Sequence, residues 1–114
     1  MKTKLIASIV IAAAGAVLSA APVYAAVDAG AAEALAKKSG CMKCHAVDKA
    51  KKGSSFKATA AKYKGKADAE AKVTDSITKS PKVKFEDGTE EAHKAIDSKD
   101  PKEIKNLVQW ILSQ

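Results

Sequence analysis

The run Cys41-Met42-Lys43-Cys44-His45 constrains this chain more than any other feature of its sequence. It has the form C-x-x-C-H, which is the attachment signature of a c-type haem. Two thiols three positions apart can reach both vinyl groups of one porphyrin and form thioether bonds with them. The imidazole that follows the second cysteine is then close enough to bind the iron from one face. The motif therefore predicts one covalent haem c (iron) per chain, held by Cys41 and Cys44 with His45 as the proximal ligand.

Two other uses of a C-x-x-C pair compete with haem attachment. A disulfide or a thioredoxin-type redox pair needs no histidine directly after the second cysteine. A zinc site would need further ligands, and beyond the motif the chain offers one other histidine, His93. Haem attachment is favoured over both, because the start of the chain also resembles an export signal and exported chains are where this motif is used.

Residues 1–25 have the three parts of a secretory signal peptide. Two lysines open it, an apolar run extends from Leu5 to Leu18, and Val23 and Ala25 are the small residues of a cleavage site. The run of about 14 residues is shorter than the roughly 20 that span a bilayer. We therefore expect cleavage after Ala25 rather than an uncleaved membrane anchor.

Cleavage leaves residues 26–114, or 89 of the 114 residues, which is enough for one small domain. A chain this short has a thin core. A covalent haem supplies apolar surface for such a core to condense around, as metals and disulfides do in other small domains. We expect the chain without haem to be largely unfolded. We also expect it in the periplasm, because bacteria attach haem to this motif outside the cytoplasm.

Apart from the two histidines, the basic side chains of the chain are all lysines, and there is no arginine. Residues 26–114 carry 18 lysines and 13 acidic residues, a net charge of +5. The simplest interpretation is a generic soluble surface. The functional one is a docking face for acidic redox partner proteins, with Lys37, Lys38 and Lys43 close to the motif in sequence. Export and the lack of arginine argue against nucleic acid as a partner.

Apolar residues recur at helical spacing along most of the mature chain. The clearest helix begins at Asp100-Pro101, with aspartate at the cap, proline at the first helical position and Glu103 three residues after the cap. An apolar stripe follows it to the C-terminus. Three more helices are predicted over residues 28–39, 56–64 and 67–79, ending at Gly40, Gly65 and Ser80-Pro81.

The stretch between the last two helices carries weaker signals. Residues 82–88 show no helical period and are predicted to form a loop. Thr89 to Ile96 is predicted to form a short helix, because a threonine cap is followed by two acidic residues in the first turn. No stretch alternates as a strand does. The expected fold class is therefore all-α, with four to five short helices around one covalent haem.

This layout resembles a small bacterial class I (monohaem) cytochrome c. The resemblance covers essentially all of residues 26–114. It rests on the stretch 40–45 after an N-terminal helix, on Gly53-Ser54 followed by 56–65, and on the closing stretch 107–114. The last two are similar to stretches of short periplasmic members that donate electrons to oxidases and nitrite reductases.

The resemblance implies a class I cytochrome c fold in which the N- and C-terminal helices cross beside the haem. Leu35 and the neighbouring alanines should then pack against Leu107, Trp110 and Ile111. Family members usually have Gly-Pro after the haem loop, where the proline carbonyl accepts a hydrogen bond from the proximal histidine. Here the pair is Gly-Ser, and the carbonyl of Ser54 can take that role.

The axial methionine of the family is missing. The family places it about 16 residues before the tryptophan of the last helix. Met42 is the only methionine after the signal peptide, and it is tethered within the motif on the wrong side of the haem. His93 stands close to the expected place, 17 residues before Trp110. His93 is therefore the candidate sixth ligand.

Ligation by His93 predicts an electron-transfer protein with a bis-histidine haem of low potential, because methionine ligation raises the potential. A six-coordinate iron leaves no position for a substrate, and no other feature of the chain indicates an enzyme. Three alternatives to ligation by His93 stay open: a solvated histidine on a charged segment, an open or water-bound iron that binds or senses a small gas, and ligation by Lys82 or Lys84. The chain can also serve as a structural subunit or fused module of a larger redox complex.

Overall fold

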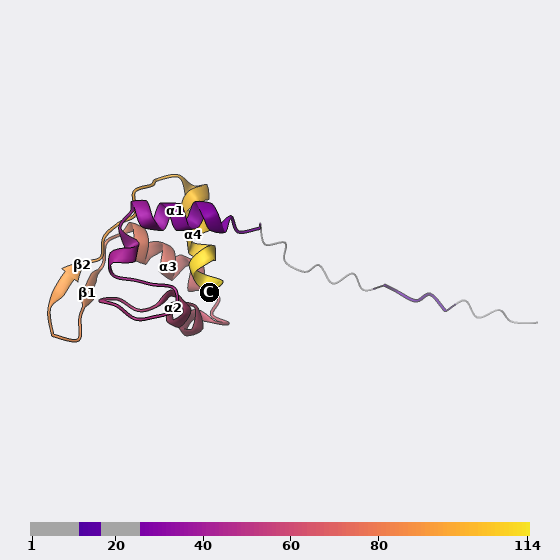
Figure 1. The fold of residues 1–114 in the computed structure, drawn as a ribbon. Helices are drawn as coiled ribbons and strands as arrows, with labels where there is room; N and C mark the ends of the chain where they lie inside the picture. Colours follow the sequence, from indigo (N-terminus) through magenta and orange to yellow (C-terminus); the bar gives the residue numbers. More distant parts are fainter. Residues whose placement is uncertain (1–11, 17–25) are drawn as a thin grey trace, which may run out of the picture.

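The computed structural model describes residues 12–16 and 26–114, so the expected cleavage site at Ala25 lies outside the described residues. No helix in the described part of the chain is long and apolar enough to cross a membrane. In chain order the elements are α1 (Ala29–Lys38), the 3-10 turn η1 (Cys41–Lys43), α2 (Phe56–Tyr63), α3 (Ala69–Thr78), β1 (Lys82–Lys84), β2 (Glu90–Ala92) and α4 (Pro101–Leu112) (Figure 1).

The helices begin at side-chain caps that the sequence indicates. The side chain of Asp28 accepts the N–H of Ala31 at the start of α1. Ser55 accepts the N–H of Ala58 at the start of α2. Asp100 accepts the N–H of Lys102 at the start of α4, with proline at the first helical position. Each cap satisfies a backbone donor that the helix itself leaves unpaired.

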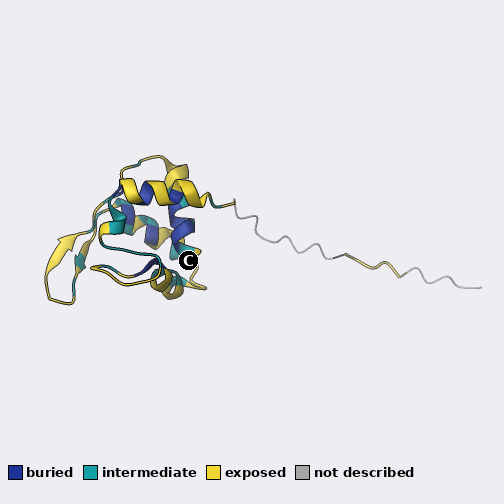
Figure 2. Cartoon of the chain, in the orientation of Figure 1, coloured by how far each residue is buried: buried dark blue, intermediate teal, exposed yellow. Residues whose placement is uncertain are grey.

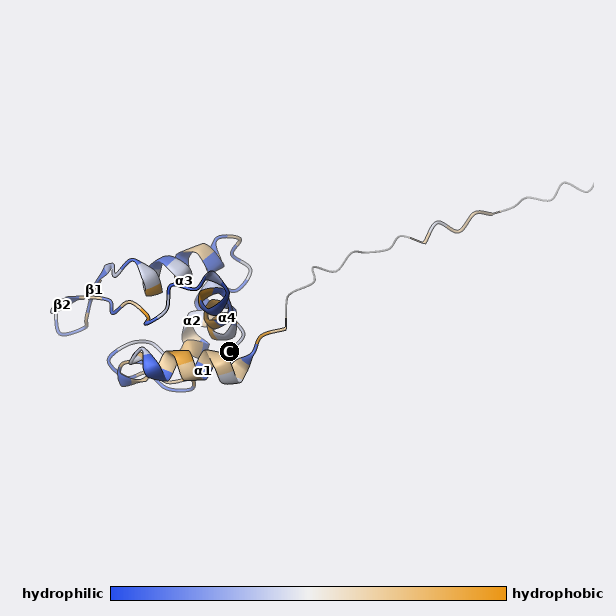
Figure 3. Ribbon diagram, turned by 90° about the horizontal axis from the view of Figure 1, so that it is seen from above, coloured by the Kyte–Doolittle hydropathy of each residue, from blue (hydrophilic) through white to orange (hydrophobic). Residues whose placement is uncertain are grey.

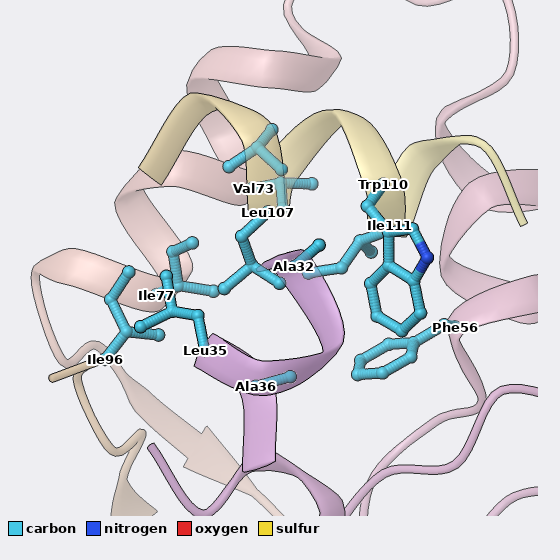
Figure 4. Close-up of a cluster of buried hydrophobic side chains, with 11 residues drawn as sticks. Ala32, Leu35, Ala36, Phe56, Val73, Ile77, Ile96, Leu107, Trp110 and Ile111 are labelled. Carbon is cyan, nitrogen blue, oxygen red and sulfur yellow. The ribbon is translucent and has the colours of Figure 1, made fainter. Parts of the chain in front are cut away.

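The core lies around α4, which packs against α1, α2 and α3. Its side chains Leu107 and Val108 are almost completely buried, at 0% and 1% exposure. The small residues Ala32 and Ala36 lie on the buried side of α1 and allow close approach of the two helices (Figures 2 and 4). The predicted packing is confirmed, because one buried cluster contains Leu35, these alanines, Leu107, Trp110 and Ile111.

Two residues far apart in the chain fasten α1 to α4. The backbone N–H of Asp28 donates to Oδ1 of Asn106 at 2.9 Å, and Nδ2 of Asn106 donates to the carbonyl of Asp28 at 2.8 Å. Val27, just before Asp28, packs against the same core. The first turn of the domain is therefore fixed to the middle of its last helix.

The expectation of a loop over 82–88 and a helix over 89–96 is wrong, as is the expectation of no strand. β1 and β2 pair antiparallel, with Lys84 opposite Glu90 and Lys82 opposite Ala92. Gly88 turns the chain with φ of 85°, a conformation that glycine adopts without steric cost. The hairpin is almost entirely exposed and polar (Figures 2 and 3). The class I cytochrome c fold is otherwise as expected, with four α-helices and little sheet among residues 12–16 and 26–114.

The hairpin is closed at its base by one backbone hydrogen bond. The N–H of His93, the residue directly after β2, donates to the carbonyl of Pro81 at 2.8 Å, just before β1. Three residues later the N–H of Ile96 donates to the carbonyl of Ile77 at the end of α3. The side chain of Ile96 is buried in the core. His93 therefore lies between the exposed hairpin and a segment of the chain that is anchored to the core at Ile96.

Candidate functional site

The C-x-x-C-H motif forms a tight turn directly after α1. Gly40 takes a left-handed conformation with φ of 77°, and the N–H of His45 donates to the carbonyl of Cys41 at 2.9 Å. Cys41 and Cys44 are both free thiols and partly buried. Burial raises the pKa of the Cys41 thiol. The turn therefore brings two unoxidised thiols and the first imidazole to one side of the domain.

His45 is held by the loop between η1 and α2. Its Nδ1 lies 2.6 Å from the carbonyl oxygen of Ser54, so Nδ1 is the nitrogen that carries the proton and Nε2 has a free lone pair. The imidazole stacks on Phe56, with ring centres 5.4 Å apart and planes inclined by 18°. A Cβ atom on Gly53 would lie 2.5 Å from Cε1 of His45. These contacts fix the ring and leave Nε2 to bind a metal.

His93 is a half-buried residue on the segment that follows β2. Its Nδ1 is the one buried side-chain polar atom without a hydrogen-bond partner among the described residues. Burial, and secondarily the charge that His45 can carry, lowers the pKa of His93 below its ordinary value of 6.5. The imidazole is therefore neutral at pH 7, which is the form that binds metals.

The two imidazoles lie close together. Their ring centres are 6.0 Å apart, with planes inclined by 52°. Two adjoining cavities of about 440 and 530 Å³ share Cys41, His45 and His93 in their linings. A metal ion bound by two imidazole nitrogens at about 2 Å each requires ring centres about 6 Å apart. The arrangement thus fits an iron between the rings and a porphyrin in the adjoining space.

The linings of the two cavities suit the two ends of a porphyrin. The smaller is largely apolar, with Phe56, Val73, Ile77 and Ile111 among its walls. The lining of the larger includes Cys44 and residues of the hairpin, with four lysines and two glutamates: Lys52, Lys62, Lys84, Lys94, Glu86 and Glu91. An apolar wall favours the ring, and the excess of lysine over glutamate favours carboxylate groups at the edge of the porphyrin. The residues present therefore fit a haem.

The structure brings the four predicted site residues together at one cavity, and parts of their surroundings were missed from the sequence. Cys41, Cys44, His45 and His93 all line one cavity. Lys37, Lys38 and Lys43 are exposed on α1 and η1 and do not belong to that lining. The sequence does not indicate the contacts of Lys52 with the hairpin, since residues 82–88 are predicted to form a loop and residues 89–96 a short helix. The Asp87-Gly88 pair is a known hairpin signal and could have indicated it.

The fold and the motif together define a small haem protein of the class I cytochrome type. The chain belongs to the cytochrome c family, since the model of that family, described as "Cytochrome c", matches residues 29–114. Members of this family are electron-transfer proteins that carry covalent haem c, and this chain has one such attachment motif, at Cys41 and Cys44.

Three relatives show the similarity. Cytochrome c-551 of Pseudomonas aeruginosa is 33% identical over 82 residues, which cover 72% of this chain and 75% of that protein. The crystal structure of the class 1 cytochrome MtoD of Sideroxydans lithotrophicus ES-1 has 57% sequence identity and a TM-score of 0.74, and it covers 77% of this chain and 97% of its own. The crystal structure of Nitrosomonas europaea cytochrome c552 has 30% identity and a TM-score of 0.56, with 71% and 96% covered.

Proposed function

We propose that this protein is a periplasmic electron carrier whose single haem is bis-histidine ligated and of low potential. Cys41 and Cys44 would hold the haem, His45 would bind the iron from the proximal face and His93 from the distal face. The observation that carries the proposal is the 6.0 Å separation of the two imidazole ring centres across a cavity lined by both cysteines. That separation matches a shared metal ion.

The protein's own residues explain how such a site would work. A bound haem supplies an iron that gains and loses one electron. The backbone carbonyl of Ser54 accepts a hydrogen bond from Nδ1–H of His45 and so keeps the lone pair of Nε2 available. Burial keeps His93 neutral, so that it too can act as a ligand. With both axial positions filled the site has no place for a substrate, which favours electron transfer over catalysis and over gas binding.

The proposed reduction potential rests on the axial ligands, and the proposed periplasmic location rests on the N-terminal sequence. Imidazole in place of a thioether sulfur lowers the potential, because methionine ligation raises it. Residues 1–25 have the composition of a cleavable export signal, and cleavage after Ala25 would leave only Ala26 and Val27 before the cap of α1. The haem domain would then comprise residues 26–114 in the periplasm.

The partners of such a carrier would be redox proteins with acidic docking surfaces. Lys52, Lys62, Lys84 and Lys94 are among the residues that line the larger cavity. Lysines at this place would steer a partner toward the haem edge, where electron transfer is fastest. Charges of this kind raise association rates more than they raise final affinity.

Visible and near-infrared spectra of the purified holoprotein test the ligation directly. Wild-type protein should be low-spin in both oxidation states, lack the near-infrared band of methionine ligation and bind carbon monoxide slowly. His93→Ala should become high-spin and bind carbon monoxide rapidly, while Lys105→Ala, an exposed residue of α4, should not. A wild-type ferrous protein that is already high-spin and binds carbon monoxide rapidly would instead support the gas-binding function.

A further inference from the structure

One lysine connects the two sides of the candidate haem cavity. Nζ of Lys52 donates to Oε1 of Glu91 at 2.8 Å and lies over the ring of Phe85, 4.5 Å from its centre. Glu91 is in β2, and Phe85 directly follows β1. The ammonium group of Lys52 therefore contacts both arms of the hairpin.

The loop that carries Lys52 is fixed to the proximal histidine. Gly53, the next residue, donates its N–H to the carbonyl of Cys44 at 2.7 Å, and its backbone lies against the ring of His45. Ser54, one residue further, accepts the hydrogen bond from that ring. The loop that carries Lys52 is thus attached directly to the turn and the ring of the proximal histidine.

The hairpin that Lys52 holds has little support of its own. Its strands contribute no buried residue, and within the described part of the chain β1 and β2 pair only with each other. Its base carries His93, whose N–H bonds to the carbonyl of Pro81. A hairpin with few apolar contacts opens more readily than the core does. Any opening at this base also displaces the backbone of His93.

We propose that Lys52 is a positioning residue for His93: by joining the proximal loop to the hairpin, it keeps the distal imidazole opposite His45. The proposal rests on the proposed function, in which His93 is the sixth ligand. Lys52 touches neither imidazole and acts through Glu91 and Phe85. Its effect is on the equilibrium between a closed hairpin and an open one.

The size of the effect follows from the two contacts. The side chains of Lys52 and Glu91 are 47% and 57% exposed, so their ion pair is modest in strength. An exposed ion pair together with an exposed cation–π contact should shift the open population by roughly threefold to tenfold. Such a shift is too small to unfold the domain and large enough to alter the release of a ligand.

The test compares four holoprotein variants with single substitutions and one with a double substitution. Lys52→Met removes the charge and keeps the aliphatic stem, Lys52→Arg restores the charge, and Glu91→Gln removes the ion-pair partner. Lys72→Met is the matched control, because Lys72 forms an equally exposed ion pair with Asp68 on α3, away from the hairpin. Two rates are measured: carbon monoxide binding to the ferrous protein, which requires His93 to leave, and hydrogen exchange of the His93 amide.

Both rates should rise roughly threefold to tenfold in Lys52→Met, return close to wild type in Lys52→Arg and stay unchanged in Lys72→Met. Combining Lys52→Met with Glu91→Gln should give less than the product of the two separate effects, because both changes remove one contact. The melting temperature should stay within a few degrees of wild type in all variants.

The two possible failures can be told apart. A low-spin wild-type protein whose rates do not respond to Lys52→Met would overturn the role of Lys52 and leave the ligation by His93 intact. A high-spin wild-type protein would overturn the proposed ligation, and the role of Lys52 with it. Hydrogen exchange of the His93 amide does not depend on the spin state, so it reports on the hairpin in either case.

Discussion

The carbonyl oxygen of Ser54 lies 2.6 Å from Nδ1 of His45, at the position where class I cytochromes usually have a proline. A backbone carbonyl can come from any residue type, so the hydrogen bond survives the replacement. Gly53, the residue before Ser54, is harder to replace. Gly53 brings its backbone against the imidazole, and a Cβ there would lie 2.5, 2.9 and 3.0 Å from three ring atoms.

Gly53→Ala should therefore displace the ring of His45. Overpacking of this kind costs about 1–3 kcal/mol. We expect a lower yield of holoprotein, a lower melting temperature and an altered ligand-field spectrum. Gly30→Ala in α1 is the control, because a Cβ there meets its nearest atom at an ordinary 3.6 Å. Identical spectra and melting curves for Gly53→Ala and wild type would contradict the described contact.

Trp110→Ala removes a large side chain that is only 4% exposed. Trp110 contacts Phe56 edge to face, with ring centres 5.5 Å apart. Truncating a buried aromatic costs about 3–5 kcal/mol, which is a large part of the about 5–10 kcal/mol that stabilises a small domain. Chemical denaturation of the holoprotein measures the loss, with Trp110→Phe as the milder comparison. An unchanged denaturation midpoint would show that this packing contributes nothing.

Mass spectrometry of the exported protein tests cleavage and attachment together. We expect the mass of residues 26–114 plus one haem when the host can mature c-type cytochromes. Replacing both Cys41 and Cys44 by serine should remove the covalent haem and leave little folded protein, because the core has few large side chains of its own. A wild-type mass without haem from a competent host would contradict the attachment. A mass that retains residues 1–25 would contradict the cleavage alone.

The lysines that line the larger cavity predict a salt-dependent reaction with an acidic partner. Electron-transfer rates should fall as salt rises, because exposed charges are screened beyond about 10 Å at 0.1 M. Lys62→Gln should lower the rate at low salt and flatten its salt dependence. Lys105→Gln, on the exposed side of α4, serves as the control. Equal rates at all ionic strengths would limit the lysines to a role in solubility.

Acid should loosen the turn of the hairpin. Asp87 accepts hydrogen bonds from the hydroxyl of Thr89 at 2.6 Å and from its N–H at 2.9 Å, and these lower the pKa of Asp87 below its ordinary value of 3.8. The folded form thus binds its proton more weakly than the unfolded one. Its stabilisation is fully present above pH 3.8 and is lost as the pH falls through the lower, folded-state pKa.

Hydrogen exchange of the Thr89 amide as a function of pH measures this loss, after correction for intrinsic exchange. Asp87→Asn should show fast exchange at all pH values, because the charge is absent throughout. A protection factor for the Thr89 amide that stays constant in wild type through this pH range would contradict a role for the carboxylate in the turn.

Local patterns were sufficient to predict most of the helices. The pair Asp100-Pro101 marks the start of α4. The apolar stripe that follows it can be recognised without knowledge of the fold. The hairpin was missed because the stretch from Thr89 to Ala92 favours a helix start when considered alone. In the folded chain Glu90 pairs with Lys84 instead. Such a cross-strand pair brings opposite charges together across the hairpin.

Likewise, one part of the candidate site could be predicted from local sequence and the other part could not. The motif from Cys41 to His45 is contiguous, so its chemistry could be predicted from spacing alone. The distance between His45 and His93 depends on the hairpin base, on the anchoring of Ile96 and on the loop around Gly53. None of these contacts is local in sequence. The sequence therefore suggested His93 as a partner, while its geometry relative to His45 required the fold.

The packing of Trp110 against Phe56, and of Phe56 against His45, gives the molecule a built-in optical reporter. Trp110 is the only tryptophan of the chain. A porphyrin in the adjoining cavity would accept its excitation energy at very short range, so native holoprotein should fluoresce weakly. Emission should increase when the domain unfolds and the indole moves away from the pigment. One fluorescence measurement on unmodified protein can then follow both the integrity of the core and the distance between α4 and the haem.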